Sequence, residues 1–87
     1  MSDTPAPALP SVTVRYWAAA REAAGVTDER LEGATVADVV DRAVDAHPAL
    51  ARVAGVATFL VDGRAAPRPT PLREGAVLEV LPPFAGG

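Results

Sequence analysis

The sequence has 87 residues, enough for one small domain around a single core. Its net charge of −3 argues against a nucleic-acid partner. Because the sequence has no apolar run of membrane-spanning length and no secretion signal at the N-terminus, we expect a cytoplasmic protein. The chain contains no Cys, which excludes disulfides and thiol catalysis, and its eight basic residues are all Arg, which excludes Schiff bases and isopeptides on its own side chains.

The N-terminal part predicts a leader, a strand and a short helix. Residues 1–10 contain three prolines, which oppose both helix and sheet, so we expect a flexible leader. The Ala-rich residues 18–24 favour a short helix that ends at Gly25. Between them, residues 12–17 alternate apolar and polar side chains and favour a strand. Trp17 would lie on the face opposite to the core-facing Val12, Val14 and Tyr16.

A longer helix gives the clearest pattern. The mostly polar residues 27–32 predict a second, partly exposed strand before it. Thr35 is a good N-cap, Asp38 lies near the positive end of the helix dipole, and Pro48 marks the end of the helix. One face of this helix is apolar and consists of Val36, Val39, Val40, Ala43 and Val44.

The C-terminal part predicts two further strands around a proline-rich segment. Residues 56–61 form an apolar run, and the Asp62-Gly63 pair after it favours a tight turn. Three prolines restrict residues 65–71 to an edge strand or a loop. Residues 76–81 predict the last strand, whose core-facing residues are Leu78 and Val80.

This order of elements is typical of an α+β fold of the β-grasp, or ubiquitin-like, type. It predicts a mixed sheet of four to five strands packed on one main helix. We divide the chain into a Pro-rich leader (1–10), a β-grasp domain (11–81) and an extended tail (82–87).

The end of the chain is its most informative feature. The last predicted strand runs into Pro82-Pro83, which cannot fold back into a ladder or a helix. The final Gly86-Gly87 pair has no Cβ atoms and fits a channel too narrow for side chains. Six extended residues reach roughly 20 Å. We therefore expect an arm that delivers the Gly87 carboxylate into the active site of another protein.

The chemistry of such an arm follows from its carboxylate. A free carboxylate is a poor electrophile, whereas an acyl-adenylate carries a good leaving group. Sulfur then displaces AMP and leaves a thiocarboxylate, a strong nucleophile at neutral pH, so that the protein acts as a group carrier. The chain offers no grouping of His, Asp and Ser that would catalyse these steps itself.

Three stretches of the sequence resemble the MoaD/ThiS family of sulfur carriers, and within it the small subunit of molybdopterin synthase. They are residues 14–25, with an aromatic pair and an Arg-Glu turn closing on Gly, residues 34–40, and residues 72–87. The Pro-Pro-x-Ala-Gly-Gly ending is the most specific of these features. The resemblance extends over about residues 12–87 and leaves only the leader uncovered.

The resemblance implies a role for each part of the tail. Gly87 would carry the thiocarboxylate, and Phe84, Ala85 and Gly86 would insert into the channel of the large subunit of molybdopterin synthase. That subunit would supply the catalytic side chains and pass the sulfur to a pterin precursor of molybdopterin, the organic part of the molybdenum cofactor. A ubiquitin-activating-like adenylyltransferase would use ATP and Mg²⁺ to activate Gly87, and a sulfurtransferase would load it. The chain alone would bind no cofactor or metal and would not be an enzyme.

Other residues fit partner contacts or ordinary structural roles. We expect the partner interface to include Trp17, Leu81, Pro82 and Pro83. The only histidine, His47, precedes Pro48 and is typical of a helix end rather than of a ligand. Asp41 and Asp45 are spaced i,i+4 and fit a solvated helix face better than a catalytic carboxylate pair.

Three other functions are consistent with the same features. Sulfur carriers also serve thiamine thiazole and cysteine biosynthesis, although Pro82-Pro83 favours the molybdopterin pathway. A protein modifier of the ubiquitin type would instead join Gly87 to a target Lys. A β-grasp binding domain would make no use of its tail.

Overall fold

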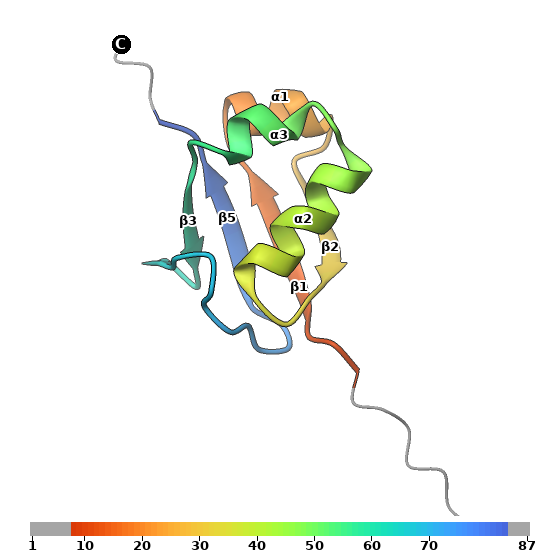
Figure 1. Ribbon diagram of the computed structural model, residues 1–87, viewed down its shortest axis with the longest axis vertical. Coiled ribbons are helices and arrows are strands. Elements are labelled where there is room, and N and C mark those ends of the chain that lie inside the picture. The colour runs from red at the N-terminus through yellow and green to blue at the C-terminus, as the bar shows by residue number, and fades with distance from the viewer. Residues whose placement is uncertain (1–7, 84–87) are drawn as a thin grey trace, which may run out of the picture.

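The computed structural model describes residues 8–83. The predicted tail residues Phe84, Ala85, Gly86 and Gly87 therefore lie outside the described residues. Figure 1 shows the elements, which in chain order are β1 (Ser11–Tyr16), α1 (Ala19–Ala24), β2 (Asp28–Glu32), α2 (Val36–Ala46), α3 (Leu50–Ala54), β3 (Thr58–Val61), β4 (Arg64–Ala65) and β5 (Val77–Leu81).

The strands of the described chain form one mixed sheet in the order β2-β1-β5-β3-β4. β1 pairs with β5 in parallel, and the other neighbours are antiparallel. α2 lies across one face of this sheet, while α1 and α3 lie close together at one end (Figure 1). The predicted α+β class and mixed five-stranded sheet are confirmed. The strand that leads into the tail thus lies in the middle of the sheet, directly beside β1.

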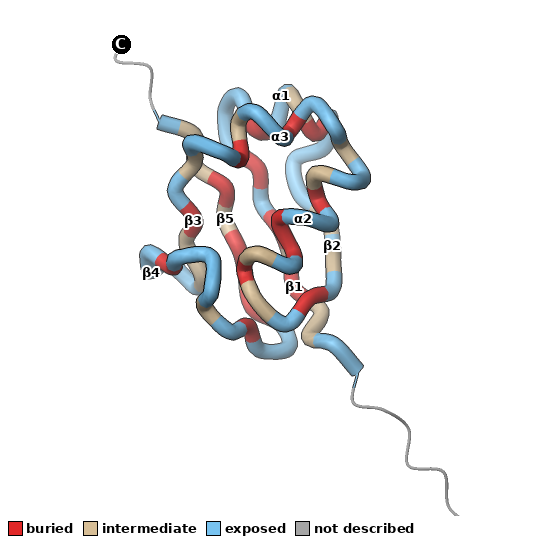
Figure 2. Tube along the Cα trace, in the orientation of Figure 1, coloured by how far each residue is buried: buried red, intermediate tan, exposed pale blue. Residues whose placement is uncertain are grey.

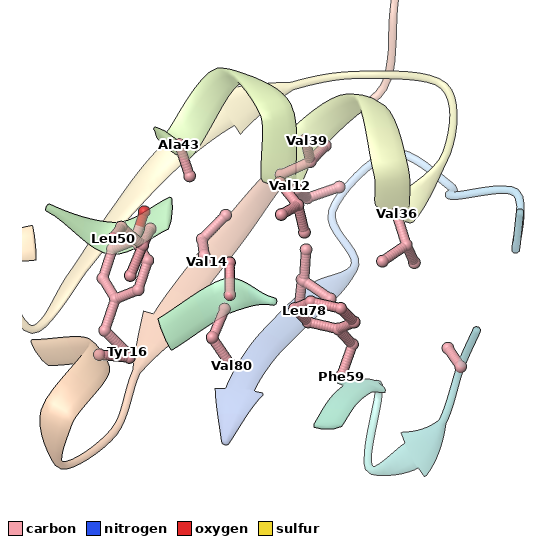
Figure 3. Close-up of a cluster of buried hydrophobic side chains, with 14 of the residues drawn as sticks. Val12, Val14, Tyr16, Val36, Val39, Ala43, Leu50, Phe59, Leu78 and Val80 are labelled. Atoms are coloured by element: carbon pink, nitrogen blue, oxygen red, sulfur yellow. The ribbon is translucent and has the colours of Figure 1, made fainter. Parts of the chain in front are cut away.

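The core lies between α2 and the covered face of the sheet, where the buried positions of both layers meet (Figures 2 and 3). Buried and less buried residues alternate along β1 and β5 as predicted. Val14 and Leu78 are fully buried, whereas Glu79, which lies between two buried positions of β5, is only half-buried. On α2, Val44 is only half-buried, whereas the rest of the predicted apolar face is buried, namely Val36, Val39, Val40 and Ala43.

The ends of the helices follow from local side-chain chemistry. The Thr35 hydroxyl accepts a hydrogen bond from the Asp38 N–H, and the Asp38 carboxylate accepts one from the Thr35 N–H, each at 3.2 Å. This reciprocal capping box satisfies two N–H groups that the first turn of a helix leaves free. α1 ends as predicted at Gly25, whose φ of 78° is a left-handed conformation that glycine adopts without a steric penalty.

Residues 49–61 contain one wrong prediction and one helix that was not predicted. β3 begins at Thr58 rather than at residue 56, and Val56 is 65% exposed. Before it lies α3, which the sequence pattern did not predict because five residues are too few to form a stable helix alone. Packing against α1 supplies the missing stability, since Leu50 and Ala54, one turn apart, are both buried. The proline-rich segment begins as the short edge strand β4, in line with the prediction.

A polar cluster of Tyr16, Glu29 and His47 fastens the end of α2 to β1 and β2. The Tyr16 hydroxyl donates to Glu29 Oε2 at 2.5 Å, and His47 Nε2 lies 2.8 Å from the same oxygen. The rings of Tyr16 and His47 meet edge to face at 6.1 Å. His47 is therefore a helix-end residue, as predicted, but its link to an inward-facing carboxylate on an edge strand was not foreseen.

We expect this cluster to limit stability at high pH. Burial, and then the hydrogen bond to Glu29 and its charge, raise the pKa of Tyr16 above its ordinary value. Above pH about 10 the unfolded chain releases the phenol proton while the folded chain keeps it, so the free energy of unfolding falls by up to about 1.4 kcal/mol per pH unit. Tyr16 is the only tyrosine, and the chain has no Lys or Cys, the other two side chains with ordinary pKa values in this range. Tyr16→Phe should remove the alkaline slope in denaturant unfolding measured from pH 8 to 11. An equally steep slope in the variant would contradict the assignment.

Candidate functional site: the root of the tail and the adjoining sheet face

The last strand is paired on both sides up to Val80 and on one side at Leu81, the residue before the tail. Val80 is opposite Tyr16 of β1 and Phe59 of β3, and Leu81 is opposite Thr58. Because β5 is paired with β3 to its last residue and with β1 to the residue before it, the strand itself fixes the direction in which the chain leaves the sheet. Beyond Leu81, Pro82 is half-buried and Pro83 is exposed.

Trp17, a predicted interface residue, lies beside this root. Its backbone N–H donates to Val80 O at 3.2 Å and its indole Nε1–H donates to Glu79 Oε2 at 3.0 Å. Its side chain therefore lies on the face opposite to Tyr16, as predicted, and it is 43% exposed. An exposed Trp held in place beside a functional segment is typical of a partner contact.

The same face of the sheet is partly apolar. Leu60 and Glu79 form one row across β3 and β5, and continuing the β1–β5 register by one residue places Trp17 opposite Leu81. The apolar members of this face are only half-buried, namely Leu60, Val77 and Leu81. A sheet face that carries such residues next to an exposed Trp has the composition of a protein–protein interface. The proposed contacts of Trp17, Leu81, Pro82 and Pro83 remain predictions, but all four lie at one end of this face.

A hollow of about 230 Å³ lies beside Trp17, between β1, α1 and the start of β2. Arg15 and Arg21 line it together with Asp28. Its mixed charges fit a polar rim around the apolar part of the face.

The other candidate residues lie on α2. Asp41 and Asp45 are both exposed on α2, as predicted for a solvated face. Within residues 8–83, no three His, Asp or Glu side chains come together as a metal-binding group. None of the helices in that part of the chain has the length and apolar character needed to cross a membrane.

A model of the ThiS family matches residues 14–87, nearly the whole chain and all of the predicted tail. The chain belongs to the ThiS family. The match confirms the family resemblance seen in the sequence, and it begins after the Pro-rich leader.

Individual relatives agree with this assignment. The molybdopterin synthase sulfur carrier subunit of Chlamydomonas reinhardtii is 33% identical over 82 residues, which cover 87% of this chain and 98% of that protein. SAMP1 of Haloferax volcanii, a small archaeal modifier protein, superposes with a TM-score of 0.80 at 34% identity, covering 88% of this chain and 99% of the other. A putative molybdopterin converting factor subunit 1 of Pyrococcus furiosus gives 0.78 at 28% identity, with 86% and 99% covered. These neighbours confirm the β-grasp fold.

Proposed function

We propose that this chain is the sulfur-donating small subunit of a molybdopterin synthase and that Gly87 carries the sulfur as a thiocarboxylate. Membership of the ThiS family makes it a sulfur carrier of the MoaD/ThiS type. The observation that carries the finer proposal is the course of β5: a strand paired on both sides up to Val80, and with β3 alone at Leu81, leads into Pro82-Pro83 and on in the sequence to Gly86-Gly87. The relative from Chlamydomonas reinhardtii supports the molybdopterin pathway.

The reaction proceeds on the tail but not by catalysis from this chain. An adenylyltransferase transfers AMP from Mg²⁺-bound ATP to the Gly87 carboxylate and releases pyrophosphate. A sulfur nucleophile, supplied by a sulfurtransferase, attacks the carbonyl and expels AMP. The thiocarboxylate then donates its sulfur to a pterin precursor in the active site of the large subunit, while water takes the place of sulfur on the Gly87 carbonyl and restores the carboxylate. The chain contributes the acyl group and the fixed geometry of its delivery.

The sheet face around Trp17 is the proposed docking surface for the large subunit. It is exposed, partly apolar and continuous with the root of the tail, so a partner bound there receives the tail directly. Phe84, Ala85 and Gly86 would then insert into the partner's channel, in which two glycines without side chains offer the least obstruction.

A second candidate function is protein modification. The similarity to SAMP1 at 34% identity favours it, because that protein is described as a modifier. The two chemistries diverge after adenylation. In protein modification the nucleophile that attacks the Gly87 carbonyl is a Lys amine of a target protein rather than sulfur, and the product is an isopeptide. Transfer of sulfur to thiamine thiazole or cysteine biosynthesis would share the thiocarboxylate and differ only in the acceptor.

The intact mass of the full chain separates these functions. After incubation with an adenylyltransferase, Mg-ATP and sulfide, we expect a mass increase equal to the replacement of one oxygen by sulfur, located at Gly87 by fragmentation. The loaded chain, mixed with a molybdopterin synthase large subunit and the cyclic pterin, should then yield the dithiolene product. Heavier adducts on other proteins would indicate modification, and transfer only to a thiazole synthase would indicate the thiamine route. An unchanged mass would refute the carrier proposal.

A further inference from the structure

Trp17 is unusually constrained for a side chain that is 43% exposed. It is the only tryptophan of the chain, and both of its N–H groups and its carbonyl are hydrogen bonded. The backbone N–H donates to Val80 O, the indole Nε1–H donates to Glu79 Oε2, and the carbonyl accepts from Ala20 N–H at 2.9 Å. Its position is thus set before any partner arrives.

The turn after Trp17 adds a second constraint. Ala18 has φ 49° and ψ −123°, which match the first central position of a type II′ turn, where glycine is usual. The bond between Ala20 N–H and Trp17 O closes this turn. A residue with a Cβ keeps such a conformation only where its surroundings impose it. The contacts of Trp17 on one side and α1 on the other therefore hold the turn in place.

Glu79 is the group that orients the indole. It projects from the central strand β5, where the register places it between Arg15 of β1 and Leu60 of β3. A carboxylate on a central strand is a better-fixed acceptor than one on a loop, and its hydrogen bond to the indole is charge-assisted. The side chain and the backbone of Trp17 therefore donate hydrogen bonds to two consecutive residues of β5, Glu79 and Val80.

We infer that Glu79 is a positioning residue that holds the Trp17 indole ready as an anchor for the large subunit. This inference rests on the proposed function. A side chain that is already immobilised loses less conformational freedom on binding than a free one, so affinity increases without any contact between Glu79 and the partner. Because both N–H groups of Trp17 donate to β5, a partner that binds the indole also holds the strand that carries the tail.

The test compares two substitutions of Glu79 in the full chain. Glu79→Gln keeps an oxygen acceptor, whereas Glu79→Leu removes it at similar size. Trp17 is the only tryptophan, so its fluorescence and its quenching by acrylamide report on this side chain alone. We expect stronger quenching and about three- to tenfold weaker binding to a molybdopterin synthase large subunit for Glu79→Leu, the effect of immobilising one side chain on binding. Glu79→Gln should resemble the wild type in both respects.

A double-mutant cycle separates positioning from general damage. In a Trp17→Phe background there is no indole N–H to orient, so Glu79→Leu should have no further effect on affinity. Glu32→Leu removes a carboxylate from the edge strand β2, two strands away from β5, and serves as the charge-matched control, which should bind as the wild type does. An equal loss of affinity in the wild-type and Trp17→Phe backgrounds, or unchanged quenching in Glu79→Leu, would overturn the inference. Failure of the wild-type chain to bind the large subunit would refute the proposed function instead, and the quenching result would still decide whether Glu79 orients Trp17.

Discussion

Deletion of Gly87 is expected to abolish sulfur transfer while the domain folds as before. Each residue of an extended chain spans roughly 3.5 Å, so a chain that ends at Gly86 presents its carbonyl that far from the reacting position. A misplacement of about 1 Å can already lower a rate about a hundredfold, so a loss of at least that size is expected. One added residue after Gly87 should have the same effect. The measurement is single-turnover sulfur transfer to the pterin precursor bound by the large subunit. The chains are thiocarboxylated chemically at their last residue, which bypasses adenylation.

Two controls make this result specific to the tail. Deletion of Ser2 shortens the chain equally in the segment that the family model does not match, and it should leave the rate unchanged. Gly86→Val keeps the length but adds a branched side chain, and it should fail for a steric reason. Unfolding curves should coincide for all variants, since the buried cluster formed by residues 8–83 extends no further than Val80. A truncated or extended chain that transfers sulfur at the wild-type rate would contradict delivery through a narrow channel.

The tail could be predicted from the sequence because its proposed role depends on which residue types it contains. Pro82-Pro83 and Gly86-Gly87 act through what they lack, namely backbone donors in the prolines and side chains in the glycines, and this is visible without a structure. The two-residue period of β1 and β5 and the helical period of α2 were equally plain, because each buries one face against the same core.

What the sequence could not reveal depends on pairings between distant residues. Trp17 and Glu79 are 62 positions apart and meet only because β1 and β5 are parallel neighbours in a defined register. The bond between His47 and Glu29 likewise depends on where α2 ends over β2. α3 was missed for a related reason: its stability comes from contact with α1 rather than from its own residues. The i,i+4 spacing of Leu50 and Ala54 was the signal available.

Gly33→Ala is expected to destabilise the domain by about 2–4 kcal/mol, which is the cost of overpacking together with a damaged helix cap. Gly33 is buried between β2 and α2, and a Cβ there would lie 2.7 Å from Val39 Cγ2 and 3.0 Å from both Val39 N and Asp38 Cβ. Val39 is fully buried and Asp38 belongs to the capping box with Thr35. Neither residue can therefore move away from the new Cβ without disturbing the core packing or the helix cap. Since a small domain has only about 5–15 kcal/mol of stability, the change in denaturant midpoint should be large.

Gly55→Ala supplies the matched control for this prediction. Gly55 follows α3 with a right-handed φ of −65°, and a Cβ there would lie no closer than 3.5 Å to its nearest neighbours, the carbonyl oxygens of Arg52 and Ala51. Alanine fits this conformation and restricts the unfolded chain, so Gly55→Ala should be neutral or stabilise the domain by up to about 1 kcal/mol. The difference in free energy of unfolding between the two variants therefore measures what the close approach of α2 to the β2–α2 connection requires of residue 33. Equal effects of the two substitutions would show that this approach does not depend on a glycine at position 33. Because α2 covers the sheet that contains β5, Gly33 contributes to the platform from which the tail is presented.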